Sequence, residues 1–363
     1  MDLRDYGFTP DGMPENGKGI PARITAVHKQ RYGLVCVYGE TYGRLKTKEY
    51  YRDVEAFPTV GDFVLINYLS GGDSQIMKTL PRKTFFSRRD PAPGGGEQAV
   101  AANFDYVFIM QSLNQNFNEK RLERYLTLAW QAGAVPVVVL TKADLTSECD
   151  SYIRIAKGIA SDVSVLAVSS KTGAGLDALA GYMTPGKTVV FLGSSGVGKS
   201  SLVNALAGEE VMAVQEIRSE DGRGRHTTTH RQLLMLGNGA MIIDTPGMRE
   251  LGMWDVSEGL GEAFADVEQY LGRCRFGNCR HQSEPGCAVR EAIEQGLLSK
   301  ERWDSYSRLK KEAKYTDDKR DFMQKRQQRN KKAGKQKNEK LSGQNALVRR
   351  SRNIMDLEVF DDE

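Results

Sequence analysis

The sequence predicts a multidomain α/β protein with a small N-terminal β-barrel, a parallel sheet covered by helices, and a C-terminal helical region that carries a cysteine cluster. Three observations support this fold class. Short runs rich in β-branched and aromatic residues fill residues 20–81, apolar strands alternate with amphipathic helices from about residue 101, and three of the five cysteines lie within 274–287. At 363 residues the chain exceeds one ordinary core, so two or three domains are expected.

The barrel is expected over residues 20–81, after a polar, glycine-rich segment 1–19 that we expect to be flexible. Five β-rich runs separated by turn residues predict a five-stranded barrel of the oligonucleotide-binding (OB) type. Such barrels display aromatic and basic side chains on one face. The candidates for that face are Arg31, Tyr32, Tyr42, Arg44 and Lys46. A spacer or a protein-binding module is the alternative interpretation of a small barrel.

Residues 82–100 combine a basic cluster with a Pro/Gly-rich break and predict a linker. Over residues 101–265, near-continuous apolar strands alternate with amphipathic helices, which predicts a parallel sheet covered on both faces. The expected strand segments are 106–113, 135–145, 163–170 and 187–193, and the expected helices are 118–134, about 148–160 and about 175–182. Two later strands, 230–237 and 240–247, are expected to form a hairpin at the edge of this sheet.

A phosphate loop, G-x-x-x-x-G-K-[ST], follows one of these strands and precedes a helix. Its glycines let backbone N–H groups face the phosphates, Lys199 can reach the β and γ phosphates, and the Ser200 hydroxyl can ligate Mg²⁺. Nucleotide binding is therefore the first functional prediction. The residues expected to bind the nucleotide here are Gly193, Ser194, Ser195, Gly196, Val197, Gly198, Lys199, Ser200 and Ser201.

A second motif, D-x-x-G, runs from Asp244 to Gly247 at the end of an apolar strand. An aspartate at a strand end can hold Mg²⁺ through water, and a glycine N–H can meet the γ-phosphate. The next residue is Met248, where many GTPases place a glutamine that orients water. A thioether cannot do this, so another group must orient the water.

The stretch TKAD at 141–144 ends another strand and resembles the N-K-x-D motif that reads guanine. The Asp144 carboxylate can accept hydrogen bonds from guanine N1–H and the 2-amino group, two donors that adenine lacks. Threonine replaces the asparagine of the motif, so a bracing amide is lost and an ATPase stays an alternative. The stretch SSK at 169–171 resembles the S-A-K loop that contacts the guanine oxygen. The candidate base-binding residues are Thr141, Lys142, Asp144, Ser169, Ser170 and Lys171.

The order of these motifs is unusual, because the base-reading motifs precede the phosphate loop, which comes first in ordinary GTPases. Joining the usual chain ends and cutting before the guanine half gives the observed order. The sheet can survive this change, since domain termini usually lie close together. The sequence therefore predicts a circularly permuted P-loop GTPase domain.

The cysteine cluster has the spacing C-x4-C-x-H-x5-C and supplies three thiolates and one imidazole within fourteen residues. This is the ligand set of a closed, structural Zn²⁺ site, and one zinc ion per chain is expected. The expected ligands are Cys274, Cys279, His281 and Cys287. Cys36 and Cys149 lie elsewhere and are interpreted as small apolar residues. A zinc-binding helical domain is expected over residues 266–320.

The stretch GRGRHTTT at 222–229 lies between the phosphate-loop helix and the D-x-x-G strand. With the permuted order, the sequence DTPG and the cysteine cluster that follows, it makes the chain resemble the bacterial ribosome small-subunit-dependent GTPase A family over about residues 20–320. The resemblance implies a late assembly factor of the small (30S) ribosomal subunit. It would bind the subunit and its rRNA in the GTP state and leave after hydrolysis to GDP.

The resemblance also implies catalytic roles. Thr228 would ligate Mg²⁺ together with Ser200, with Thr227 and Thr229 as open alternatives. His226 is the candidate that orients the attacking water, and Lys199 and Thr228 complete the catalytic set. Low intrinsic turnover with activation by a partner is expected. A nucleotide-gated RNA-binding module with negligible turnover is the rival interpretation.

Charge is distributed unevenly along the chain. Residues 308–352 carry 17 Lys and Arg against 5 Asp and Glu, a net of +12, so the rest of the chain carries −8 of the formal net charge of +4. The low-complexity tail 321–363 is therefore a candidate RNA-binding arm.

The N-terminus lacks the plan of a signal peptide and no apolar run approaches about twenty residues, so we expect a cytoplasmic monomer without a membrane partner.

Overall fold

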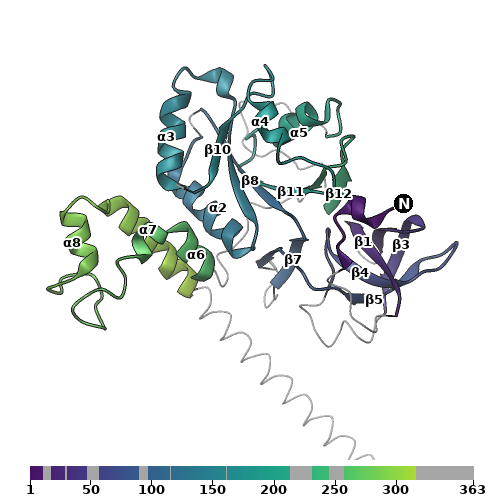
Figure 1. Cartoon of the computed structure of the whole chain (residues 1–363), viewed down its shortest axis with the longest axis horizontal. Coiled ribbons are helices and arrows are strands. Elements are labelled where there is room, and N and C mark those ends of the chain that lie inside the picture. The colour runs from purple at the N-terminus through teal and green to yellow at the C-terminus, as the bar shows by residue number, and fades with distance from the viewer. Residues whose placement is uncertain are drawn as a thin grey trace, which may run out of the picture. The chain divides into compact units, whose positions relative to one another are not determined.

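The computed structural model describes residues 1–10, 18–28, 31–46, 57–89, 97–114, 116–160, 162–212, 231–244 and 257–315. Contacts group the chain into two compact units, Met1–Lys311 and Glu312–Glu363. The strands and the helices α2 to α8 discussed below belong to the first unit, and many of them are labelled in Figure 1. Within the described residues, no helix is both long and apolar enough to cross a membrane.

The predicted N-terminal barrel is confirmed. Its strands are β1 (Ile20–Val27), β2 (Tyr32–Cys36), β3 (Gly39–Leu45), β4 (Phe63–Asn67) and β5 (Ser74–Thr79). They pair in the order β1-β2-β3-β5-β4, and β4 pairs back onto β1, which closes the ring. Alternate side chains point inward because successive residues of a strand face opposite sides. The buried core of the barrel consists of Ala22, Ile24, Leu34, Cys36, Val64, Ile66 and Ile76.

The N-terminal segment differs from its prediction as a flexible chain, because residues 1–10 pack against the barrel. A short 3-10 turn, Leu3–Tyr6, buries both of its terminal side chains. The buried guanidinium of Arg23 donates a 2.6 Å hydrogen bond to the Tyr6 carbonyl oxygen, and the Phe8 ring meets Phe63 edge-on. A few apolar side chains are thus enough to hold a polar segment in place. Residues 11–17 lie outside the described part of the chain.

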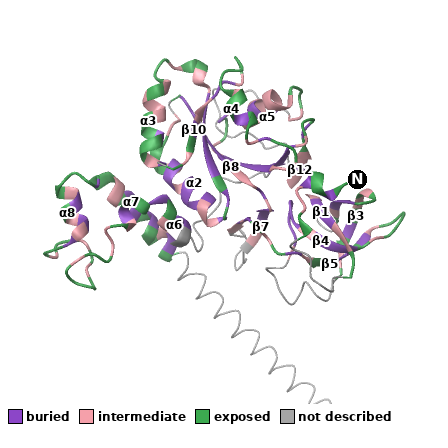
Figure 2. Ribbon diagram, viewed as in Figure 1, coloured by how far each residue is buried: buried purple, intermediate pink, exposed green. Residues whose placement is uncertain are grey.

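The central domain is a six-stranded part of the main sheet. Its strands are β8 (Tyr106–Ser112), β9 (Val135–Thr141), β10 (Ser164–Ala167), β11 (Thr188–Gly193), β12 (Arg231–Met235) and β13 (Met241–Asp244). They lie in the order β10-β9-β8-β11-β13-β12, and all pairings are parallel except that of β12 with β13. The apolar runs in these strands are buried, as Figure 2 shows for β8 and β11.

Helices cover the two faces of this sheet (Figure 1). They are α2 (Glu119–Gln131), α3 (Cys149–Ile159), α4 (Leu176–Ala180) and α5 (Lys199–Ala207). Apolar side chains of α4 and α5, such as Leu179 and Leu202, join the core formed by β8, β9, β11 and β13. The expected parallel sheet with covering helices is therefore present.

The predicted hairpin is formed by β12 and β13, but β12 is not an edge strand. It pairs on its other side with barrel strand β1, with Ala26 opposite Gln232 and Val27 opposite Arg231. The barrel and the central domain consequently share one eleven-stranded sheet. Buried Arg23 strengthens this junction, because it also donates a 2.8 Å hydrogen bond to the Asn103 carbonyl oxygen.

The segment predicted as a linker contains β6 (Phe85–Arg89) and β7 (Glu97–Ala102), which pair as a separate antiparallel sheet. The ring of Phe86 stacks on Phe104 at 4.8 Å between centroids, which anchors the hairpin to the central domain. Residues 90–96, which include the glycine run, lie outside the described part.

The last part of the first unit contains α6 (Ser257–Ala263), α7 (Ala265–Glu268), α8 (Ala288–Glu294) and a helix that begins at 300. The cysteine-rich segment connects α7 to α8. Arg302 joins this part to the central domain, because it forms an ion pair with the buried Glu123 of α2 at 3.2 Å. Its second ion pair, with Asp266 of α7 at 2.9 Å, lies within the C-terminal part itself.

Candidate functional site

The predicted nucleotide motifs meet at the carboxyl ends of the parallel strands. Strands β9 and β10 follow β8 in the sequence and lie on one side of it in the sheet, whereas the next strand, β11, lies on its other side. The strand order therefore reverses between β8 and β11. In open α/β sheets, ligands bind outside the carboxyl ends of the strands at such a point.

The phosphate loop connects β11 to α5. Gly193 ends the strand, and a Cβ atom there would lie 3.1 Å from the side chains of Met110 and Val197, so the close packing favours glycine. Gly196 and Gly198 have φ of 69° and 103°, which a side chain would disfavour. Lys199 begins α5, so free backbone N–H groups and the positive end of the helix dipole lie at the loop.

The phosphate-loop lysine contacts the D-x-x-G aspartate. The Lys199 ammonium forms a short ion pair with the Asp244 carboxylate at the end of β13, although the two residues are 45 apart in sequence. Asp244 is buried, and Lys199 is partly exposed. Two predicted phosphate and Mg²⁺ ligands are thus brought together. Lysine can exchange a carboxylate for a phosphate oxygen, because both are anionic acceptors.

Two side chains of the base-reading turn bond to the phosphate loop. Thr141, 2% exposed, donates a 2.6 Å hydrogen bond from Oγ1 to the Val197 carbonyl oxygen. Lys142 Nζ donates a 2.9 Å bond to the Gly196 carbonyl oxygen. The sequence predicted that replacing asparagine by threonine removes a bracing contact, but the threonine hydroxyl supplies one. The turn itself is sharp, because Lys142 has a left-handed φ of 60°.

Asp144 is oriented by the neighbouring loop. The Ser169 hydroxyl donates a 2.6 Å hydrogen bond to Asp144 Oδ1 and accepts a 3.2 Å bond from the Thr172 N–H. This hydrogen bond lowers the pKa of Asp144, and the charges of Lys171 and Lys142 lower it further. The carboxylate is therefore ionised at neutral pH and can accept two donors from a base. Ser170, next in the loop, is partly exposed.

One residue near the phosphate loop is not predicted by any of the sequence motifs. The side-chain amide of Asn116, in the connection from β8 to α2, donates a 3.0 Å hydrogen bond to Ser194 Oγ. The available signal was the polar run NQNFN at 114–118, directly after a buried strand. That strand borders the point where the strand order reverses, so its carboxyl end belongs to the site.

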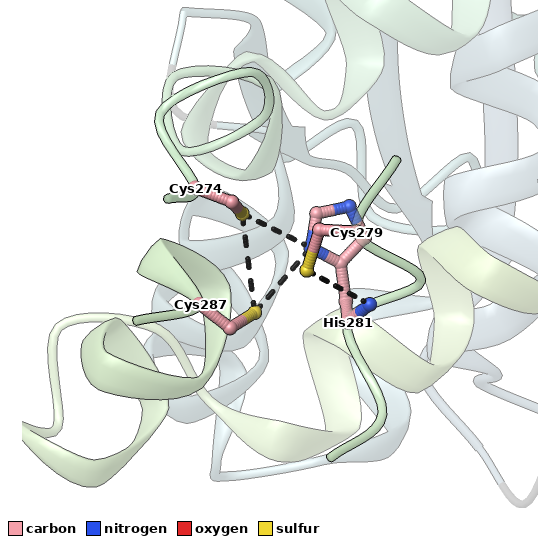
Figure 3. A group of neighbouring side chains, drawn as sticks. All are labelled: Cys274, Cys279, His281 and Cys287. Carbon is pink, nitrogen blue, oxygen red and sulfur yellow. Dashed lines mark hydrogen bonds between the residues drawn. The ribbon is translucent and has the colours of Figure 1, made fainter. Parts of the chain in front are cut away.

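The four predicted zinc ligands converge in a separate cluster (Figure 3). Their ligand atoms all lie within 4.8 Å of one another. His281 Nδ1 is 3.4 Å from the sulfur atoms of Cys274 and Cys287 and 3.7 Å from that of Cys279. Around a tetrahedral Zn²⁺ with bonds of about 2.0–2.3 Å, ligand atoms are separated by roughly 3.5–3.8 Å. The cluster therefore fits a tetrahedral Cys₃His metal site, and Cys36 and Cys149 lie apart from it as free thiols.

The expected nucleic-acid face of the barrel carries exposed aromatic and basic groups. Arg31 lies over the Tyr42 ring at 3.7 Å and, like Arg44, forms an ion pair with Asp73. Another aromatic contact of the barrel joins the exposed Tyr38 to the half-buried Tyr68, with ring centroids 4.6 Å apart. Lys46 is exposed and Tyr32 is half-buried.

Several predicted residues lie outside the described part of the chain. They are the switch candidates His226, Thr227, Thr228 and Thr229, the D-x-x-G residues Gly247 and Met248, and the basic tail 321–363.

Comparisons with known proteins agree with these motifs. A family model described as RsgA GTPase matches residues 79–254, and a second, described as ABC transporter, matches residues 176–346, which include the phosphate loop. The chain is 43% identical over 321 residues to "Small ribosomal subunit biogenesis GTPase RsgA 2" of Lactiplantibacillus plantarum, covering 87% of this chain and 90% of that protein. It is 44% identical over 259 residues to "Small ribosomal subunit biogenesis GTPase RsgA" of Methanosarcina acetivorans, covering 71% of this chain and 70% of that protein.

Solved structures show the same architecture. The crystal structure of YjeQ from Thermotoga maritima superposes with a TM-score of 0.61 at 26% identity, covering 80% of this chain and 96% of that one. The structure of YloQ, described as a circularly permuted GTPase, superposes with a TM-score of 0.57 at 25% identity, covering 83% and 98%. The predicted permutation of the central domain is thereby confirmed.

Proposed function

Because this chain belongs to the RsgA GTPase family, we propose that it hydrolyses GTP and acts in the late assembly of the small ribosomal subunit. The observation that carries the proposal is the pair of hydrogen bonds from Thr141 and Lys142 to the phosphate loop. They fix the base-reading turn relative to the phosphate site, as recognition of a guanine nucleotide requires.

Guanine would be read by Asp144, oriented by the buried Ser169 and covered by the stem of Lys142. Adenine would leave the carboxylate without its two donors, which disfavours ATP. The phosphates would be held by backbone N–H groups of residues 193–200, by Lys199, and by the start of α5. Asp244 and Gly247 would complete the γ-phosphate side.

Mg²⁺ would accompany the nucleotide, held by Ser200 and Thr228, with Asp244 contributing through water. The ion supplies neutralisation of the charge on the phosphates. His226 would orient the attacking water, since an imidazole nitrogen can accept a hydrogen bond from it. The roles of Thr228 and His226 rest on the family resemblance.

A single Zn²⁺ would be held by Cys274, Cys279, His281 and Cys287. Four protein ligands fill a tetrahedral shell, so the ion would be structural. Arg302 links the helix after this cluster to Glu123 of α2, so a folded zinc region would be anchored to the central domain.

We assign the chain to an OB-type barrel at 20–81, a GTPase domain at 101–265 and a zinc-binding domain at 266–320. The barrel face around Tyr42 and Tyr38, together with the +12 segment 308–352, would contact rRNA through stacking and phosphate neutralisation. The partner would be the small ribosomal subunit. The chain would act as a monomer in the cytoplasm, where ribosomes assemble.

The proposal is tested by cosedimentation of the purified chain with small ribosomal subunits. A non-hydrolysable GTP analogue should retain the chain on the subunit, whereas GDP and an ATP analogue should not. The Asp144→Asn variant with the GTP analogue is the control for base recognition. Equal cosedimentation with GDP, GTP analogue and no nucleotide would refute nucleotide-gated binding.

A further inference from the structure

The β8–α2 connection places a side-chain amide on the phosphate loop. Asn116 Nδ2 lies 3.0 Å from Ser194 Oγ, and Ser194 directly follows the first glycine of the loop. The two residues are 78 apart in sequence and come from different motifs. Neither the phosphate-loop pattern nor the base-reading motifs include an asparagine at this place.

The orientation of this amide is fixed by an arginine of α2. Arg121 Nη2 donates to Asn116 Oδ1 at 3.0 Å and forms a short hydrogen bond with the Asn116 carbonyl oxygen. The same nitrogen also lies 3.2 Å from Gln111 Oε1, so its two protons are shared among three acceptor oxygens. Because Oδ1 faces a donor, Nδ2 must be the atom that faces Ser194. The Asn116 amide is therefore a donor to the serine hydroxyl.

The hydrogen-bond polarity leaves the Ser194 proton available. A hydroxyl that accepts through its oxygen still has one proton to donate. Among the residues that the structure describes, no acceptor for this proton is found. Arg121 supplies a positive charge behind the Asn116 amide, and two further donors of this network, Gln111 Nε2 and Arg121 Nε, are buried without an acceptor among the described residues. The local charge therefore favours an anionic acceptor for the Ser194 proton.

We propose that Asn116 is a positioning residue that directs the Ser194 hydroxyl toward a phosphate oxygen of the bound guanine nucleotide. The pair adds a side-chain phosphate contact to those of the loop backbone and Lys199. Arg121 strengthens the contact by polarising the amide, since linked hydrogen bonds reinforce one another. The inference rests on the proposed function, because it requires a bound nucleotide.

Asn116→Asp is the sharpest test, because it preserves size and the contact with Arg121 but reverses the polarity of the contact with Ser194. A carboxylate can only accept, so the serine must turn its proton away from the nucleotide. Equilibrium affinities for GTP and GDP are measured with the full-length chain, and melting temperatures without nucleotide check folding. We expect an affinity about 10- to 100-fold weaker in Asn116→Asp and in Ser194→Ala, as for loss of a hydrogen bond to a charged group.

Three comparisons make the result specific. Ser194→Thr, which keeps the hydroxyl, should recover most of the affinity that Ser194→Ala loses. Asn118→Asp adds the same charge two residues away and still caps α2, where Asn118 accepts from the Arg121 N–H at 2.9 Å, so its affinity should stay near that of the wild type. The double variant Asn116→Ala/Ser194→Ala should bind no more weakly than Ser194→Ala, since the two substitutions remove the same phosphate contact.

If Asn116→Asp and Ser194→Ala bind GTP more weakly but GDP normally, the contact is with the γ-phosphate. If they bind both nucleotides more weakly, the contact is with a phosphate that GDP also carries. Unchanged affinity in Ser194→Ala, or an equal loss in Asn116→Asp and Asn118→Asp, would overturn the inference. Failure of the wild-type chain to bind GTP would instead refute the proposed function.

Discussion

Thr141 donates a 2.6 Å hydrogen bond from its buried hydroxyl to the carbonyl oxygen of Val197, which joins the base-reading turn to the phosphate loop across 56 residues of sequence. The side chain of Val197 is itself buried under the loop. The bond therefore connects two anchored segments, and the distance between the base site and the phosphate site depends on it.

Replacing Thr141 by valine should weaken GTP and GDP binding by about 1–2 kcal/mol, because the Val197 carbonyl oxygen loses a buried donor. Thr141→Ser keeps the hydroxyl and is the matched control. Titration of both nucleotides against each variant measures the effect. Wild-type affinity in the valine variant would show that the bond does not set the geometry of the site.

Base choice should reside in Asp144. Asp144→Asn should lose about 2–4 kcal/mol of GTP binding, because paired, charge-assisted acceptors are removed. Xanthosine triphosphate has a carbonyl oxygen in place of the 2-amino group of guanine, and the new amide can donate to it, so this nucleotide should gain affinity. Normal GTP binding by Asp144→Asn would mean that another residue reads the base.

Phosphate binding and hydrolysis should separate by mutation. Lys199→Ala and Ser200→Ala should impair binding of the nucleotide or of Mg²⁺, since both side chains face the phosphates in the proposed complex. His226→Ala should keep GTP affinity and lower kcat in the presence of small subunits. The comparison requires nucleotide titration and steady-state GTP hydrolysis by the same preparations, and full turnover in His226→Ala would remove this histidine from the mechanism.

The metal should be structural. Metal analysis should find one zinc per chain, and chelation or Cys279→Ala should unfold the region after about residue 270 and weaken subunit binding. GTP binding should persist, because the phosphate loop belongs to a different part of the fold. Cys149→Ala is a control outside the cluster. A zinc-free protein with this region still folded would contradict the assignment.

Motif spacing predicted much of the fold and site. The glycines of the phosphate loop predict a left-handed backbone, which Gly198 adopts. The C-x4-C-x-H-x5-C pattern predicts converging metal ligands, and Cys274 lies with the other three. Apolar runs in β8, β9 and β11 likewise predicted buried parallel strands. These features depend on residues close together in sequence.

Long-range pairings could not be predicted in the same way. The contact of Asn116 with Ser194 and the pairing of β12 with β1 join segments that carry no signal for one another. The replacement of asparagine by Thr141 was predicted to remove a bracing contact, because the sequence does not show that the threonine hydroxyl bonds to a carbonyl oxygen of the phosphate loop. The packing of residues 1–10 was missed because their few apolar residues stand in a polar segment.

The proposed subunit-dependent GTPase activity is tested most directly by the rate of GTP hydrolysis by the full-length chain with and without purified small ribosomal subunits, with ATP as the competing substrate. We expect slow hydrolysis by the chain alone, strong stimulation by small subunits, and little hydrolysis of ATP, with the stimulation lost in Lys199→Ala. Hydrolysis that small subunits leave unchanged, or equal use of ATP and GTP, would contradict it.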